Sequence, residues 1–151
     1  DFIFGYALPL LPMALVQTVI CYGTALLLGL QPSWGILYAV AGTVPLAMFF
    51  IALGLLCGSV CTSKQVGGLC GALLTNLTAW LSGAWFDLEL VGGVFEAAAN
   101  VLPFTHGVQM GRALLAENIA DIFPHLWWIL GYMLLSILLA VLLFLRQMKR
   151  Q

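Results

Sequence analysis

Residues 35–60 read GILYAVAGTVPLAMFFIALGLLCGSV, and this stretch contains no charged side chain. A transmembrane helix needs about 20 predominantly apolar residues to cross the hydrocarbon core of a bilayer. Strands of a membrane β-barrel are nearer to about ten residues long and alternate apolar with polar side chains. Because the apolar residues here are continuous and Pro45 lies near their middle, the stretch predicts a membrane-spanning helix with a bend.

The rest of the chain has a similar character. Three further runs without charge occupy residues 6–30, 65–86 and 126–145. Hydrophobic residues form 63% of the chain and charged residues only 7%, whereas a soluble domain carries about 25% charged residues. A fold of 151 residues could not bury so much apolar surface away from water. Lipid must therefore be the solvent for most of this surface.

The sequence accordingly predicts an all-α fold, a polytopic transmembrane helix bundle. In this interpretation residues 1–151 form a single transmembrane domain. The expected membrane-crossing helices cover about residues 6–30, 34–61, 65–82 and 124–146. The chain begins at Asp1 with neither an initiating Met nor a signal-peptide pattern, so we expect it to be a fragment.

The segment from Gly83 to Pro124 differs from the rest because most of the charged side chains lie in it. It also holds two apolar pieces, residues 91–102 and 104–116, which are too short to span a membrane and are separated by Pro103. We expect a re-entrant helical hairpin over residues 91–116, before the last helix, enclosed by protein or by a water-filled cavity. The alternative is a pair of helices lying on the membrane surface.

Three ionisable residues lie on the two halves of this hairpin: Glu96, His106 and Arg112. A charge at membrane depth is costly and usually indicates function or pairing. Glu96 and Arg112 can form a pair across the hairpin. The alternative is that all three side chains reach the water of the outer leaflet.

The basic residues predict the orientation. Lys64 lies between the second and third helices, and Arg146, Lys149 and Arg150 follow the last helix. If the hairpin does not cross, these two sites share one face, which the positive-inside rule makes cytoplasmic. We therefore expect a multi-pass protein of the plasma (inner) membrane with a cytoplasmic C-terminus and an outer acidic segment.

Small and polar residues within the apolar runs are candidates for helix contacts. Gly54 with Gly58 and Gly67 with Gly71 are GxxxG pairs, which let helices approach closely, although glycine is also frequent in membrane helices by chance. Gln17 and Asn76 must face protein or water, because an unpaired amide in hydrocarbon is costly. They predict either a translocation pathway or interhelical hydrogen bonds.

Several classes of function are excluded or disfavoured. The net charge is −1 and there is no basic stripe, so nucleic acid is not an expected partner. The motifs HExxH, GxSxG and GxGxxG are absent, as is a complete phosphate-binding loop. The four cysteines lack the spacing of a metal site and are predicted to be buried free thiols. We expect neither catalysis nor a bound metal in this chain.

Three stretches resemble the membrane permeases of type-2 ATP-binding-cassette (ABC) exporters. Residues 4–9, FGYALP, resemble the start of that family's third helix, and residues 81–86, LSGAWF, the end of its fifth. Residues 102–107, LPFTHG, followed by 111–115, GRALL, resemble its hairpin. The resemblance covers nearly the whole chain, as the last four membrane helices with the hairpin before the final one.

The resemblance implies a dimer of permeases driven by two ATP-binding-cassette ATPase subunits or domains, which would hold the ATP and Mg²⁺. The substrate would move outward between the permeases. The helix over residues 65–82 would help to line the route, and its best pathway candidates, which share one helical face, are Leu73, Asn76, Leu77 and Trp80. The hairpin would act as an outer gate carrying Glu96, Pro103, His106 and Arg112.

Two other functions remain open on the sequence. A stand-alone channel or secondary carrier would need no ATPase, but a carrier usually shows an internal repeat, and none is found. An embedded enzyme lacks a catalytic cluster, since His106 and His125 are 19 positions apart. Most of the coupling helix that contacts the ATPase in the resembled family is absent from this chain. Lipid, drug, polysaccharide and peptide exporters cannot be told apart here.

Overall fold

The computed structural model describes residues 2–148 and contains only helices and turns within that range. The basic residues Lys149 and Arg150, used above to orient the chain, lie outside the described residues. In chain order the elements are α1 (Phe2–Leu27), α2 (Trp34–Val60), α3 (Ser63–Val66), the π-helical η1 (Gly67–Leu74), α4 (Thr75–Leu81), α5 (Leu88–Val91), α6 (Gly93–Val101), α7 (Pro103–Leu115) and α8 (Ile119–Met148). The predicted all-α transmembrane bundle is confirmed.

Long apolar helices dominate the described chain. Three of them are long and apolar enough to cross a membrane, at Leu8–Leu27, Trp34–Val60 and Ile119–Arg146. The helix expected over residues 65–82 is continuous from Ser63 to Leu81 but is divided by η1. At the rise of an α-helix these residues would extend about 28 Å, close to the thickness of a bilayer core. A span by this helix stays a prediction.

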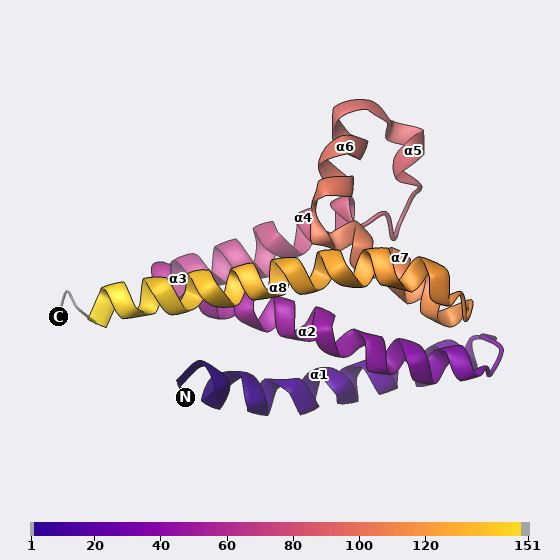
Figure 1. Ribbon diagram of the computed structural model, residues 1–151, viewed down its shortest axis with the longest axis horizontal. Helices are drawn as coiled ribbons and strands as arrows, with labels where there is room; N and C mark the ends of the chain where they lie inside the picture. Colours follow the sequence, from indigo (N-terminus) through magenta and orange to yellow (C-terminus); the bar gives the residue numbers. More distant parts are fainter. Residues whose placement is uncertain (1, 149–151) are drawn as a thin grey trace.

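The long helices run along one common axis (Figure 1). α1 packs antiparallel on α2, and α2 packs along α8. α2 and α8 begin at the same end of the molecule, and the start of α3 lies at the other end (Figure 1). α4 leads back from there towards the hairpin, which therefore joins two helices that run in opposite directions.

The hairpin has two unequal halves that meet at Pro103, as the sequence predicted. α7 packs against both α2 and α8, and its buried residues are Pro103, Thr105, Gly107, Met110, Ala113 and Leu114. α6 packs mainly on α4, α5 and α7, is joined to α8 by the hydrogen bond from the Tyr132 hydroxyl to Val101, and projects from the bundle with α5 (Figure 1). The half that enters the bundle is therefore enclosed by protein, as a re-entrant segment requires.

The core lies where α2, α7 and α8 converge. Its buried members are Ala39 on α2, Met110 and Leu114 on α7, and Ile129 on α8. Glycines allow the close approach: a Cβ atom on Gly35 would lie 2.5 Å from the carbonyl oxygen of Leu115, and one on Gly42 would overlap the side chain of Leu114. The first half of α2 therefore packs closely on the C-terminal part of α7, with no side chain of α2 between them at Gly35 and Gly42.

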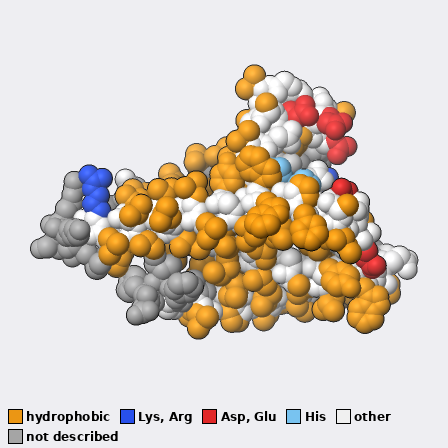
Figure 2. Space-filling view, viewed as in Figure 1, with side chains coloured by type: hydrophobic (Ala, Val, Ile, Leu, Met, Phe, Trp, Pro, Cys, Tyr) orange, Lys and Arg blue, Asp and Glu red, His pale blue; other side chains and the backbone are white. Residues whose placement is uncertain are grey.

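Charge is divided between the two ends of the molecule. All acidic side chains of the described residues lie between Asp87 and Asp121, in the hairpin and its flanking turns. Figure 2 shows them gathered at the end opposite to the one where α8 finishes, where Lys and Arg side chains lie. The long apolar surface between the two ends carries almost no charge in this view (Figure 2).

Candidate functional site

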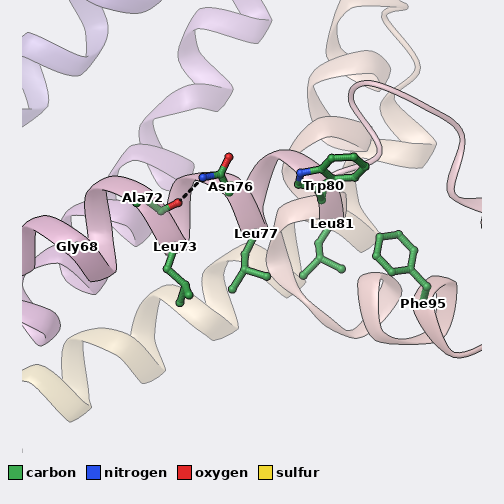
Figure 3. A pocket seen from close by; sticks show the side chains of 8 residues that line it. All are labelled: Gly68, Ala72, Leu73, Asn76, Leu77, Trp80, Leu81 and Phe95. Atoms are coloured by element: carbon green, nitrogen blue, oxygen red, sulfur yellow. Dashed lines mark hydrogen bonds between the residues drawn. The ribbon is translucent and has the colours of Figure 1, made fainter.

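A shallow groove of about 610 Å³ runs along the helix from Ser63 to Leu81. Four of its lining residues are those predicted for a pathway, Leu73, Asn76, Leu77 and Trp80. The others are Gly68, Ala72, Leu81 and Phe95. Figure 3 shows Leu73, Leu77 and Leu81 in one row, with Asn76 and Trp80 beside them. Residues four apart share a helical face, so the groove is the surface that the spacing predicted.

The π-helical segment η1 positions the side-chain amide of Asn76, the polar group that lines the groove. The Thr75 hydroxyl donates to the carbonyl of Cys70, five residues back, at 3.0 Å. The Asn76 Nδ2 donates to the carbonyl of Ala72 at 2.7 Å (Figure 3). No described residue donates to the Asn76 Oδ1 in return. The groove therefore presents one amide oxygen on a wall that is otherwise aliphatic and aromatic.

A second hollow of about 390 Å³ adjoins the groove and shares Asn76 and Trp80 with it. Its remaining lining residues are Ala79, Trp85 and Phe86. The rings of Trp80 and Phe86 lie 5.8 Å apart, and Phe86 is stacked on Phe95 at 6.3 Å. This aromatic wall was not predicted as part of the site, although Trp85 and Phe86 belong to the LSGAWF motif that carried the resemblance.

Gln17 does not join the other predicted pathway residues. It lies on α1, is exposed, and lines neither hollow. α1 packs on α2, whereas the groove lies on the helix from Ser63 to Leu81. Within the described chain Gln17 and Asn76 therefore do not share a surface, because polarity alone does not say which helices are neighbours, and a place for Gln17 in the pathway stays a prediction.

Two residues of α7 fasten the hairpin to the end of α4. The Thr105 hydroxyl is buried and lies 2.7 Å from the carbonyl oxygen of Leu81 and 3.0 Å from that of Ala99. The Arg112 Nη2 donates to the carbonyl oxygen of Gly83 at 3.1 Å. Carbonyls at the C-terminal end of a helix lack partners within the helix, so these contacts satisfy groups that would otherwise be orphaned. The LSGAWF and LPFTHG motifs thus contact each other.

The predicted pair of Glu96 with Arg112 is not formed in the described structure. The guanidinium of Arg112 instead contacts Gly83, next to the end of α4. Glu96 lies half-buried in the first turn of α6. The sequence suggested a pair because both charges lie on the hairpin, but α6 and α7 meet near Pro103, far along the chain from Arg112.

Pro103 and His106 lie where the hairpin turns. Pro103 occupies the first turn of α7, where a missing N–H costs no hydrogen bond, and it is fully buried. The His106 Nδ1 lies 2.8 Å from the Nδ1 of His125 on α8, and its Nε2 lies 3.0 Å from the carbonyl oxygen of Asn100. His106 is also stacked on Trp128 at 5.0 Å. The two histidines, 19 positions apart in sequence, are thus in direct contact.

Glu117 was not singled out from the sequence, yet it caps α2. Its Oε1 accepts a hydrogen bond of 3.0 Å from the backbone N–H of Gly35, in the first turn of α2. Glu117 has a φ of 56°, a left-handed conformation that is uncommon for residues other than glycine. A carboxylate at a helix N-terminus is stabilised by the helix dipole. The turn between α7 and α8 is therefore tied to the start of α2.

The glycine pairs predicted for helix packing do not pack within this chain. A Cβ atom on Gly54, Gly58, Gly67 or Gly71 would meet nothing within 4 Å. The close approaches of the described chain are made by Gly35, Gly42 and Gly107 instead. The GxxxG spacing identifies a smooth surface, but it does not identify what covers that surface. Contact of these pairs with a second chain stays a prediction.

Comparison with known proteins identifies the chain. Residues 1–116 match the family described as "ABC-2 type transporter". The chain belongs to this family. The match includes α1 to α7, and with them the groove and the whole hairpin. The chain is therefore a membrane component of an ABC-2 type transporter.

A curated relative covers most of the chain. Nodulation protein J of Rhizobium leguminosarum bv. trifolii is 25% identical over 124 residues, which cover 82% of this ABC-2 chain and 47% of the relative. The chain thus spans about half the length of that relative. No solved structure matches the chain. Within the described residues no group of three or more His, Cys, Asp or Glu side chains could hold a metal ion.

Proposed function

We propose that this ABC-2 permease moves a substrate outward across the plasma (inner) membrane, using ATP hydrolysed by a partner ATP-binding-cassette subunit or domain. The observation that carries the proposal is the groove on the helix from Ser63 to Leu81, which lies within the family match and contains four residues predicted for a pathway. ATP and Mg²⁺ would be held by the partner, because this chain offers no phosphate-binding loop.

A second permease copy, identical or related, would complete the route. The groove is open along its length: the side chains of Leu73 and Trp80 are 56% and 61% exposed in the single chain. A closed path for a polar or amphipathic solute needs a second protein wall, because lipid offers no hydrogen-bond partners. The open glycine surface of Gly67 and Gly71 lies on the same helix and would let a partner helix approach closely.

The charge distribution supports the direction of transport. Lys64 and Arg146 lie at one end of the bundle and the acidic residues at the other, with the uncharged surface between them. By the positive-inside rule the basic end, where α8 finishes, would be cytoplasmic and the hairpin would lie on the outer side. The ATPase would then act at the basic end, and the substrate would leave beside the hairpin.

The hairpin is suited to act as an outer gate. α7 is fixed between α2 and α8, whereas α6 is attached at its ends and by few contacts to α4. The groove reaches α6 through Phe95, so movement of α6 would change the outer end of the groove. Thr105 and His106 hold the junction between the fixed and the projecting half, and Arg112 ties the fixed half to the turn after α4.

Reconstitution of the full-length permease with its ATPase tests this function. The full-length protein is purified from its native membrane, the co-purifying ATP-binding subunit is identified, and both are placed in proteoliposomes. We expect the permease to stimulate ATP hydrolysis and membrane extracts from the host to stimulate it further. Leu142→Ala, on the exposed surface of α8 away from the groove, serves as a control for Leu77→Trp within it. Absence of any associated ATPase would contradict the proposal.

A further inference from the structure

The contact between His106 and His125 allows only certain protonation states. The carbonyl oxygen of Asn100 can only accept, so the His106 Nε2 at 3.0 Å from it must carry a hydrogen. In a neutral His106 the Nδ1 then has a free lone pair, and the His125 Nδ1 at 2.8 Å must donate to it. The tautomers of both rings are therefore fixed by one backbone carbonyl.

One added proton leaves this hydrogen bond intact, and a second one breaks it. The first proton binds to the His125 Nε2, and the His125 Nδ1–H continues to donate to His106. A second proton has to bind to the His106 Nδ1. Two N–H groups would then face each other at 2.8 Å, with a positive charge on each ring. The two rings must separate, because neither nitrogen retains a lone pair for the other.

The two histidine rings lie where the C-terminal end of α6 is attached to α7 and α8. α6 ends with the carbonyls of Ala99, Asn100 and Val101, and each is held by a side chain from another element. Thr105 binds Ala99, His106 binds Asn100, and the Tyr132 hydroxyl donates to Val101 at 2.9 Å. His125, Trp128 and Tyr132 form one face of α8, and Trp128 is stacked on both His106 and Tyr132. Separation of the histidines would disturb the attachment of α6 to α8.

The charged and titratable groups near His106 and His125 come from α2, α6, α7 and α8. Asp121 on α8, whose Oδ2 accepts a hydrogen bond from Asn118, is the charged group that acts on His125. His106 responds to burial and to the Asn100 carbonyl, and it acts in turn on His125. The other titratable side chains on α7 and on the described elements packed against it are Tyr38 and Cys57 on α2, Glu96 on α6, Arg112 on α7, and Tyr132 and Arg146 on α8, and the hydrogen bonds of the two rings involve none of them.

We propose that the His106–His125 contact is an acid-sensitive latch between α7 and α8, which also holds the end of α6 through the bond of His106 to the Asn100 carbonyl, and that it releases this end when both rings are protonated. Burial lowers the pKa of His106 below its ordinary value of 6.5. The proton that opens the latch therefore binds only in acid, and the latch stays closed at neutral pH. The latch lies at the acidic end of the bundle, so the pH on that side of the membrane controls it.

Spin labels on the full-length protein in lipid nanodiscs measure the latch without any transport assay. The native cysteines are replaced by alanine, and labels are attached at Val94→Cys on α6 and Leu134→Cys on α8, both exposed positions. We expect a narrow distance distribution at about pH 8 and loss of the narrow peak at about pH 5, on either side of the ordinary histidine range. An unchanged distribution would overturn the proposal, whether or not the protein exports a substrate.

Two variants of His125 show whether an acid-induced change in the label distance comes from the two histidines or from another titratable group. The carboxamide of His125→Asn can donate to a neutral His106 or, after rotation, accept from a protonated one, so the narrow peak should persist at both pH values. His125→Phe keeps a ring but offers no hydrogen bond, and the peak should be broad at both. If His125→Asn broadens in acid as the wild type does, another group is responsible and the latch is rejected.

Discussion

The hydroxyl of Thr105 lies 2.7 Å from the carbonyl oxygen of Leu81, so one side chain of α7 closes the C-terminal end of the helix that carries the groove. The same hydroxyl is 3.0 Å from the carbonyl oxygen of Ala99 in α6. Three elements therefore meet at one buried oxygen atom. The hairpin and the groove are therefore structurally connected, and a substitution that moves one should change the conformation of the other.

Thr105→Val should loosen this junction. Valine has the shape of threonine but removes the hydroxyl donor from the carbonyl of Leu81, whereas Ala99 keeps the backbone N–H of Leu102, and an unpaired buried carbonyl costs about 1–3 kcal/mol. We expect a lower midpoint of thermal unfolding in detergent. Thr24→Val is the matched control, because the Thr24 hydroxyl is exposed and bonds only to its own helix. Equal shifts for the two variants would show that the Thr105 contact does not stabilise the fold.

Arg112→Ala should impair transport more than folding. The Arg112 side chain is largely exposed and its bond to Gly83 is screened by solvent, so its loss should lower stability by only about 1 kcal/mol. The orientation of the turn after α4 should change, and with it the outer end of the groove. Arg112→Lys keeps a donor and should recover part of the activity in proteoliposomes. Loss of expression in proportion to activity would indicate a purely structural role.

Asn76→Leu should reduce ATP-dependent transport while leaving stability almost unchanged. The Asn76 side chain bonds only to Ala72 in its own helix, so the fold does not depend on it, but its Oδ1 is the amide oxygen that the groove offers to a solute. Transport by the reconstituted complex and thermal unfolding are measured together. Thr75→Val, one residue earlier and bonded to the same helix, is the control. Wild-type transport by Asn76→Leu would remove Asn76 from the pathway.

Gly35→Ala should be far more damaging than Gly54→Ala. A Cβ atom at position 35 would lie 2.5 Å from the backbone oxygen of Leu115, which cannot rotate away, and such overpacking costs about 1–3 kcal/mol. Gly54 has open space around it, and alanine there improves helix propensity by up to about 1 kcal/mol. Thermal unfolding of both variants distinguishes the two environments. Similar destabilisation would contradict the packing of α2 on α7.

Labelling from the two sides of sealed vesicles tests the orientation. Single cysteines at Glu89 and Asn118 lie before and after the hairpin and are both exposed, so an impermeant maleimide should reach both from the outer side. A cysteine at Lys64 should react only from the cytoplasmic side. If Glu89 and Asn118 are reached from opposite sides, the hairpin crosses the membrane and the proposed direction of export loses its support.

Local chemistry explains which features could be predicted from the sequence. Long uncharged runs predict helices because every backbone group in lipid must be paired within its own segment. Pro103 predicts the turn of the hairpin because proline is favoured in the first turn of a helix, where its missing N–H costs no hydrogen bond. The face of Leu73, Asn76, Leu77 and Trp80 could be predicted because residues four apart share a side of any helix, even one interrupted by η1.

Contacts between distant segments could not be predicted in the same way. Spacing marked Gly54 and Gly58 as a smooth surface, but only the fold shows that Gly35 and Gly42 face α7. Polarity grouped Gln17 with Asn76, although their helices do not share the groove. His106 and His125 appeared too far apart in sequence to interact, and the turn between α7 and α8 brings them to 2.8 Å. The glycine contacts, the position of Gln17 and the contact between the two histidines each depend on how whole helices are arranged in space.

The cap that Glu117 provides to Gly35 links residues 82 positions apart, and this has a consequence for biogenesis. A ribosome delivers Gly35 to the membrane long before Glu117 exists, so the amide at the start of α2 has no partner from this chain until the hairpin has been synthesised. The start of α2 can therefore receive this cap only after residue 117 has been synthesised. A nascent chain stopped short of Glu117 should be recognised by membrane quality-control proteases, and a complete one should escape them.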